Sequence, residues 1–357
     1  MVASGAGWCF GIVSLFVGLA ILTSVPVGQF LVLGYLLEVA GRVARTGRLR
    51  DGFIGVRAAG SLGGIALGCA CLWLPLYFLS IFAENATIID PGGRSARRLN
   101  LALGVLGLLY LLHVVAACLR GGRLRDFLRP FNLLWLVRRV ARGGAYAEAR
   151  DGLWHFVAGL RLPYYFWRGL RGFLGAFLWL VVPLSLLGQG HENPLLAVIG
   201  GLLLGVVVIW LPFLQVRFAR DDRLRAYGEL RAVRADFARA PLAFAVALTV
   251  HLSSAVPLYL LKIEVIPRDL MFLEGLVFLL FMFPARLLGG WAYARSARRD
   301  APRHGLWRWA ARLAVLPVVA AYVLVVFASQ HVGWYGISSL YEQHAFLLPV
   351  PFVTGPD

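Results

Sequence analysis

Residues 99–125 read LNLALGVLGLLYLLHVVAACLRGGRLR, and this stretch decides the fold class. No Asp, Glu, Lys or Arg lies between Leu99 and Leu119, and as an α-helix this part is about 31 Å long. Such a helix crosses the hydrocarbon core of a membrane, where only a helix satisfies its own backbone groups. The arginines that follow at once, beginning with Arg120, are typical of a cytoplasmic helix end. The stretch therefore predicts a transmembrane helix.

The same pattern recurs along the whole chain. Hydrophobic residues make up 60% of the 357 residues and charged residues only 15%, whereas about a quarter of the residues of a soluble protein are charged. Eight stretches are apolar and long enough to span a membrane: Trp8–Ala40, Ala58–Ala83, Leu99–Leu119, Trp167–Gly188, Pro194–Phe218, Pro241–Leu261, Leu270–Gly290 and Ala314–Gln330. The sequence predicts an all-α, polytopic transmembrane helix bundle of about eight spans.

The first of these stretches is too long for one straight crossing. As a helix, Trp8–Ala40 would be about 50 Å long, and Pro26 interrupts it. Either one kinked helix enters the membrane and continues along its inner surface, or two helices form a hairpin. The hairpin adds a ninth membrane segment and places the amino terminus in the cytoplasm.

The basic residues define an orientation. Of the 35 Lys and Arg residues, 30 fall in four segments, Arg42–Arg57, Arg120–Arg171, Arg217–Arg239 and Arg286–Arg312, which together carry a net charge of +21. The remaining connections and the tail carry −2. Under the positive-inside rule this pattern predicts a bacterial cytoplasmic (inner) membrane protein with cytoplasmic basic loops and an extracytoplasmic carboxyl terminus. The rule also accounts for the net charge of +17 without nucleic acid as a partner.

Four regions follow from the spans. We expect an amino-terminal membrane region (1–119), cytoplasmic interfacial amphipathic helices (120–166), a five-span bundle (167–330) and an extracytoplasmic tail (331–357) that folds back onto the outer interface. In the second region apolar residues recur at helical spacing with arginines between them, as in helices that lie on a membrane surface. Arg138, Arg139 and Arg142 are the candidate contacts to anionic lipid headgroups, and docking of a partner protein is the alternative.

Two sequence repeats stand out. The motif Arg-x-x-Arg-Leu-Arg occurs at Arg45–Arg50, Arg120–Arg125 and Arg220–Arg225, each time directly after a membrane stretch. It reflects either a duplication or the chance matches of an arginine-rich sequence. Glycines at every fourth position, in the ridges 60–68 and 201–205, let helices approach closely. We expect them to be packing seams within one bundle, with a homodimer interface as the alternative.

One family resemblance is carried by the first 80 residues. Gly34-Tyr35-Leu36-Leu37 follows a Pro-broken apolar helix, and Gly47-Arg48-Leu49 follows a basic helix end. In these features the chain resembles bacterial multi-pass membrane proteins of the domain of unknown function family 4013. It departs from that pattern at Asp51-Gly52-Phe53. The resemblance implies a membrane location and no mechanism.

Polar residues inside spans are costly and so are candidates for function. His113, His251, Glu274 and Arg286 are such residues, and a meeting of His251 with Glu274 would allow proton relay or cation binding. The alternative is that His251 bonds a neighbouring helix and Glu274 reaches the headgroups. Metalloprotease, P-loop and nucleophile-elbow motifs are absent from the sequence, and we predict no catalytic, cofactor or metal site.

Three functions remain in order of preference. The first is a non-enzymatic role in membrane organisation, assembly or lipid contact, with the anionic headgroups of the bilayer and a membrane protein as partners. The second is a small-solute or ion transporter with a polar site at the membrane midplane, since broken helices and midplane polar residues are typical of transporters. The third is an intramembrane enzyme, for which an inward-facing cluster of His and carboxylate residues would be needed.

Overall fold

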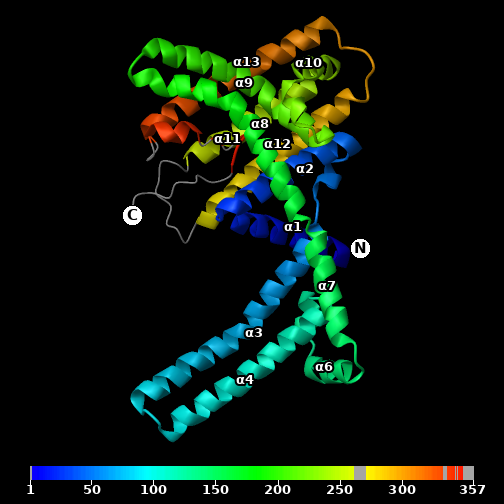
Figure 1. The fold of residues 1–357 in the computed structure, drawn as a ribbon, viewed down its shortest axis with the longest axis vertical. Coiled ribbons are helices and arrows are strands. Elements are labelled where there is room, and N and C mark those ends of the chain that lie inside the picture. The colour runs from blue at the N-terminus through cyan, green and yellow to red at the C-terminus, as the bar shows by residue number, and fades with distance from the viewer. Residues whose placement is uncertain (1, 261–270, 333–335, 342, 344, 349–357) are drawn as a thin grey trace. The chain divides into compact units, whose positions relative to one another are not determined.

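The computed structural model of the chain describes residues 2–260, 271–332, 336–341, 343 and 345–348 (Figure 1). Helices and no strands occur in these residues. The α-helices are α1 (Val2–Thr23), α2 (Pro26–Thr46), α3 (Val56–Ile89), α4 (Arg94–Leu119), α5 (Leu124–Phe127), α6 (Asn132–Ala141), α7 (Ala145–Gly159), α8 (Leu162–Gly188), α9 (Pro194–Asp221), α10 (Leu230–Arg239), α11 (Pro241–Leu260), α12 (Met271–Ser296) and α13 (Gly305–Val332). Short 3-10 helices are η1 (Leu49–Gly52), η2 (Gln189–His191), η3 (Leu224–Gly228) and η6 (Gly336–Tyr341).

Nine helical segments of the described chain are long and apolar enough to cross a membrane. The protein is therefore an all-α, multi-pass integral membrane protein, and the predicted fold class is confirmed. The ninth segment arises because α1 ends at Thr23 and α2 begins at Pro26. Gln29 Nε2 donates to the carbonyl oxygen of Thr23 (3.2 Å) across this break. The first apolar stretch thus forms two helices, as in the two-segment interpretation, and not one kinked helix.

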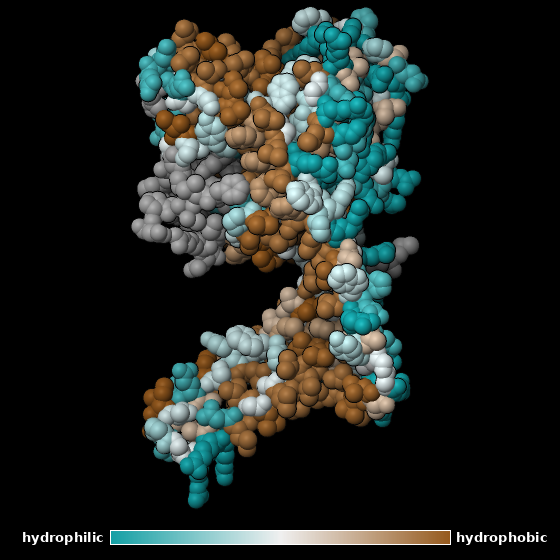
Figure 2. All heavy atoms as spheres, viewed as in Figure 1, coloured by the Kyte–Doolittle hydropathy of each residue, from teal (hydrophilic) through white to brown (hydrophobic). Residues whose placement is uncertain are grey.

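The chain divides into two compact units. The hairpin unit contains Met1–Leu15 and Gly55–Leu160, and the bundle unit contains Phe16–Ile54 and Arg161–Asp357. In Figure 2 hydrophobic residues cover the middle of the α3–α4 hairpin and hydrophilic residues gather at both of its ends. In the bundle unit, hydrophilic residues gather on the side where α10 lies. An apolar band between polar ends is the surface expected of helices that cross a membrane.

The hairpin unit is built on the antiparallel helices α3 and α4 (Figure 1). The predicted glycine ridge of α3 packs inside this unit, because a Cβ at Gly68 would lie 2.4 Å from the ring of Phe127 and one at Gly64 would lie 3.1 Å from the backbone nitrogen of Leu124. Helix α6 exposes an apolar stripe formed by Leu134, Val137 and Val140, and Phe131, which precedes its first turn, is exposed as well. This exposed stripe on a helix that also carries arginines is the expected form of an interfacial amphipathic helix.

The bundle unit is centred on α2, which packs against α8, α9 and α12. Helices α2 and α8 cross in direct backbone contact, because a Cβ at Gly34 would lie 1.8 Å from the carbonyl oxygen of Tyr165 and one at Gly169 would lie 1.8 Å from that of Phe30. Only glycine allows this approach. A Cβ at Gly201 would lie 3.5 Å from Val323 of α13 and one at Gly205 would lie 3.6 Å from Val319, which are ordinary van der Waals distances, so this ridge also faces a helix of the same chain.

A buried ion-pair network connects three helices of the bundle unit. Glu38 of α2 accepts hydrogen bonds from Arg45 (2.7 Å) and from the hydroxyl of Tyr164 on α8 (2.9 Å). Arg168 of α8 pairs with the same carboxylate and donates to the carbonyl oxygen of Ala219 on α9 (2.8 Å). The side chains of Arg168 and Glu38 are only 2% and 11% exposed. The network therefore fixes α2, α8 and α9 against one another from inside.

The three Arg-x-x-Arg-Leu-Arg copies share one backbone conformation. In each copy the third residue is left-handed, with φ of 71° at Gly47, 64° at Gly122 and 51° at Asp222. The fourth residue is extended, and the leucine at position five begins η1, α5 or η3. The motif thus encodes a common structure in which a membrane helix ends, the chain turns and a short helix begins.

The described residues of the tail from Ser339 onward are largely buried within the bundle unit. Leu340, Ala345 and Phe346 are fully buried, and they contact helices that the sequence assigns to membrane spans. These residues therefore pack against helices of the bundle unit, and the expected position of the tail at the outer interface stays a prediction. Irregular backbone is stable at membrane depth where protein groups satisfy its carbonyls, and side chains of α9, α11 and α12 do so here.

Candidate functional site

Buried hydrogen-bond donors of three helices meet at the tail in the bundle unit. Arg286 of α12 donates through Nη1 to Gln215 Oε1 of α9 (2.7 Å) and through Nη2 to the carbonyl oxygen of Ala345 (3.1 Å). His251 Nε2 of α11 donates to the same carbonyl (2.9 Å), and Gln215 Nε2 donates to that of Phe346 (2.7 Å). Each of the three donor side chains is 3% exposed or less. We call this set the donor cluster.

Two tyrosines extend the donor cluster toward the tail. The hydroxyl of Tyr322 on α13 donates to Gln343 Oε1 (2.7 Å), and that of Tyr259 on α11 donates to the same atom (3.1 Å). Gln343 is itself fully buried and donates to the carbonyl oxygen of Leu340 (2.8 Å). The acceptors of the donor cluster therefore come largely from the tail.

A pocket of about 240 Å³ lies beside the donor cluster. Its lining is mostly apolar and comes from α11 and α13: Leu252, Ser253, Val256, Pro317, Val318, Ala321 and Tyr322. Tyr322 belongs to both places, because its ring lines the pocket while its hydroxyl bonds Gln343. A ligand with one acceptor-rich end and an apolar body matches this combination.

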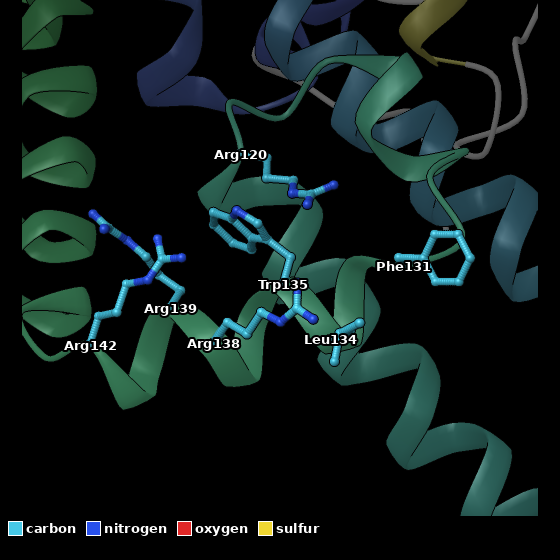
Figure 3. A pocket seen from close by; sticks show the side chains of 7 residues that line it. All are labelled: Arg120, Phe131, Leu134, Trp135, Arg138, Arg139 and Arg142. Atoms are coloured by element: carbon cyan, nitrogen blue, oxygen red, sulfur yellow. The ribbon is translucent and has the colours of Figure 1, made fainter.

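A second candidate site lies in the hairpin unit, where α6 carries a basic pocket of about 180 Å³ (Figure 3). The pocket is lined by Arg120, Phe131, Leu134, Trp135, Arg138, Arg139 and Arg142. The guanidinium of Arg120 lies 4.7 Å from the centre of the Trp135 ring and donates to Asn132 Oδ1 (2.9 Å). Arg139 pairs with Glu148 of α7. The other lining arginines carry a positive charge that no acidic lining residue offsets. We call this basic pocket the arginine pocket.

An apolar pocket of about 300 Å³ adjoins α6 on another side. It is formed by Leu72, Pro75, Leu76, Leu79, Leu106, Leu109, Tyr110, His113 and Leu133, so α3 and α4 make most of it. His113 Nε2 lies 3.1 Å from Asn132 Nδ2 and 2.9 Å from the carbonyl oxygen of Phe127. Asn132 thus links a residue of this pocket to Arg120 of the arginine pocket.

The predicted polar residues do not form one site. His251 and Arg286 meet at the carbonyl of Ala345, as shown above, whereas His113 belongs to the other unit. Glu274 lies in the first turn of α12, about 18 Å along the helix axis before Arg286. In the residues that the structure describes, no group of three or more His, Cys, Asp or Glu could hold a metal ion. Residues 262–269, which the charge pattern predicts as an extracytoplasmic loop, lie outside the described residues.

Sequence reasoning missed several members of these sites. Gln215 and Gln343 are buried and central to the donor cluster, but an amide in an apolar stretch does not reveal whether it faces lipid or protein. The ion-pair network has a clearer signal in the sequence than these amides have, because Glu38 is a charged residue within an apolar stretch.

Comparisons with known proteins add nothing to these sites. No family model, curated protein or solved structure matches this chain.

Proposed function

We propose that this protein holds anionic phospholipid at the arginine pocket and serves a non-enzymatic role in organising the inner membrane, with its basic helix ends in the cytoplasm. The observation that carries the proposal is the placement of Arg138 and Arg142 on a helix that exposes an apolar stripe. Phosphate groups and arginines form strong charge-assisted hydrogen bonds, and an apolar stripe inserts beside them at headgroup level.

The charge of the pocket is available to a ligand. Arg138 and Arg142 are both exposed. Of the arginines that line the pocket, only Arg139 has an ion-pair partner among the described residues, and this partner is Glu148. Trp135 lines the same pocket and adds an amphipathic ring of the kind found at membrane interfaces. The arrangement therefore favours a headgroup with a net negative charge over a zwitterionic one.

The adjoining apolar pocket supports a lipid over a free phosphate ion. Its leucines lie on α3, α4 and α6, next to the helix that carries the arginines. An acyl chain gains roughly 0.8 kcal/mol for each CH₂ group that it buries. A diacyl lipid can therefore use both pockets, whereas inorganic phosphate can use only one.

Lipid retention measured by native mass spectrometry tests the proposal. The double variant Arg138→Gln/Arg142→Gln removes two charges, each worth about 1 kcal/mol toward an anionic membrane, so it should bind phosphatidylglycerol about 30-fold more weakly. The matched control is Arg94→Gln/Arg97→Gln, because these exposed residues lie at the opposite end of α4. Equal loss in both variants, or equal retention of phosphatidylcholine by the unchanged protein, would contradict the proposal.

Transport of a small solute is the second candidate function. The donor cluster favours it, because buried polar residues in the middle of membrane helices commonly line substrate pathways. Replacing His251 by Asn and Arg286 by Gln should then abolish uptake of an anionic solute into proteoliposomes. Unchanged uptake in both variants would leave only the lipid-contact role.

A further inference from the structure

Among the described residues, the hydrogen bonds between the tail and the donor cluster run in one direction. The helices provide the donors Arg286, Gln215, His251, Tyr259 and Tyr322, and the tail provides the acceptors. Two of these acceptors are backbone carbonyls, of Ala345 and Phe346. A group of buried donors is a site for a ligand rich in acceptors, and here the tail provides those acceptors.

The charge of Arg286 is not neutralised among the described residues. Its two hydrogen bonds go to neutral oxygens, and its Nε is buried with no hydrogen-bond partner. A guanidinium that is 2% exposed normally has a carboxylate partner, because a buried charge is costly without one. Carbonyl dipoles only partly replace such a partner, so an anion would bind more strongly than the tail carbonyl does.

The neighbouring pocket limits the rest of the ligand. Its volume of about 240 Å³ and its apolar lining suit a hydrocarbon body of moderate size. Arginine binds carboxylates with two parallel hydrogen bonds, which its Nη and Nε atoms can provide. A monocarboxylate with an apolar chain satisfies the cation, the donors and the pocket together.

We propose that the donor cluster of α9, α11 and α12, together with the pocket between α11 and α13, is a binding site for an apolar monocarboxylate, such as a medium-chain fatty acid, and that tail residues 343 and 345–348 are its internal competitor. In the ligand-free protein the carbonyl of Ala345 occupies the position of the carboxylate. Binding displaces the tail, so the apparent affinity equals the intrinsic affinity multiplied by the fraction of molecules in which the tail has left the donor cluster. This site lies in the bundle unit and does not depend on lipid at the arginine pocket.

Octanoate and the full-length protein test this inference. Octanoate should raise the hydrogen exchange of backbone amides in residues 343 and 345–348, whereas 1-octanol, with the same apolar chain and no carboxylate, should not. Gln343→Ala removes two tyrosine hydrogen bonds that hold the tail and should raise the apparent affinity for octanoate about tenfold or more. Arg286→Gln should abolish the response to octanoate.

Each outcome decides between the alternatives. A response to octanol equal to that of octanoate, or an unchanged octanoate affinity in Gln343→Ala, would overturn the inference. Both tests use variants or ligands that leave Arg286 in place, so they remain valid if Arg286→Gln fails to fold. The variant Arg138→Gln/Arg142→Gln should respond to octanoate like the unchanged protein, which separates this site from the lipid-contact proposal.

Discussion

The ion-pair network around Glu38 gives a prediction with a defined magnitude. Glu38→Gln keeps the size of the side chain but removes the charge that pairs with Arg168, which is 2% exposed. Arg168 then has the carbonyl of Ala219 at 2.8 Å and the carboxylate of Asp222 at 3.6 Å, and Asp222 is 45% exposed. Removing one partner of a buried pair costs about 3–5 kcal/mol. We expect a loss near 3 kcal/mol, because Asp222 compensates in part.

The assay is chemical unfolding in mixed micelles, followed by tryptophan fluorescence. Arg45→Gln is the matched control: it removes a second partner of Glu38, but its side chain is 39% exposed, so the expected loss is below about 1 kcal/mol. Glu38→Gln/Arg168→Met removes both buried charges and should be more stable than the sum of the two single losses predicts, by about 0.5–3 kcal/mol. Additive losses, or a Glu38→Gln loss no larger than that of Arg45→Gln, would refute the reasoning.

Three further predictions concern the bundle unit. Gly34→Ala should lower the free energy of unfolding by about 3 kcal/mol, because its Cβ would meet the backbone of α8. Gly18→Ala is the control and should cause no such loss, because a Cβ there would have nothing within 4 Å. Chemical unfolding in micelles distinguishes the two variants. Gly47→Ala should cost about 1–2 kcal/mol in the same assay, because its φ of 71° is left-handed. Burial raises the pKa of Tyr227, whose hydroxyl donates to the carbonyl of Gly172. The free energy of unfolding should therefore fall as the pH rises above about 10, where the tyrosine of the unfolded chain loses its proton. Tyr227→Phe should remove part of that fall in thermal unfolding curves recorded against pH.

The sequence predicts the membrane helices because their physical cause is local. An apolar stretch such as Leu99–Leu119 must satisfy its own backbone groups in lipid, and no distant residue changes this requirement. The break between α1 and α2 is also local, since Pro26 has no backbone hydrogen to donate. Such features depend on neighbouring residues alone and can therefore be read from the chain.

The sites depend on residues that are far apart in the sequence. Arg286 and Gln215 are separated by 71 positions, and His251 and Ala345 by 94. Helical periodicity predicts which residues share a face of one helix but not which helices become neighbours. Glu274 and Arg286 are the opposite case, because the 12 positions between them on one helix already predict a separation of about 18 Å.

The two buried arginines Arg168 and Arg286 of the bundle unit differ in whether a ligand can replace the group that they bind. Arg168 pairs with Glu38, a side chain fixed on the central helix α2, and releasing it would separate packed helices. Arg286 instead bonds a backbone carbonyl of the tail, which follows α13 and is no part of a membrane helix. A backbone carbonyl is present at every residue, so no residue type in the tail marks this contact. Because a carboxylate would provide what that carbonyl lacks, a negative charge, the contact favours replacement by an anion, whereas the Arg168 pair already has one.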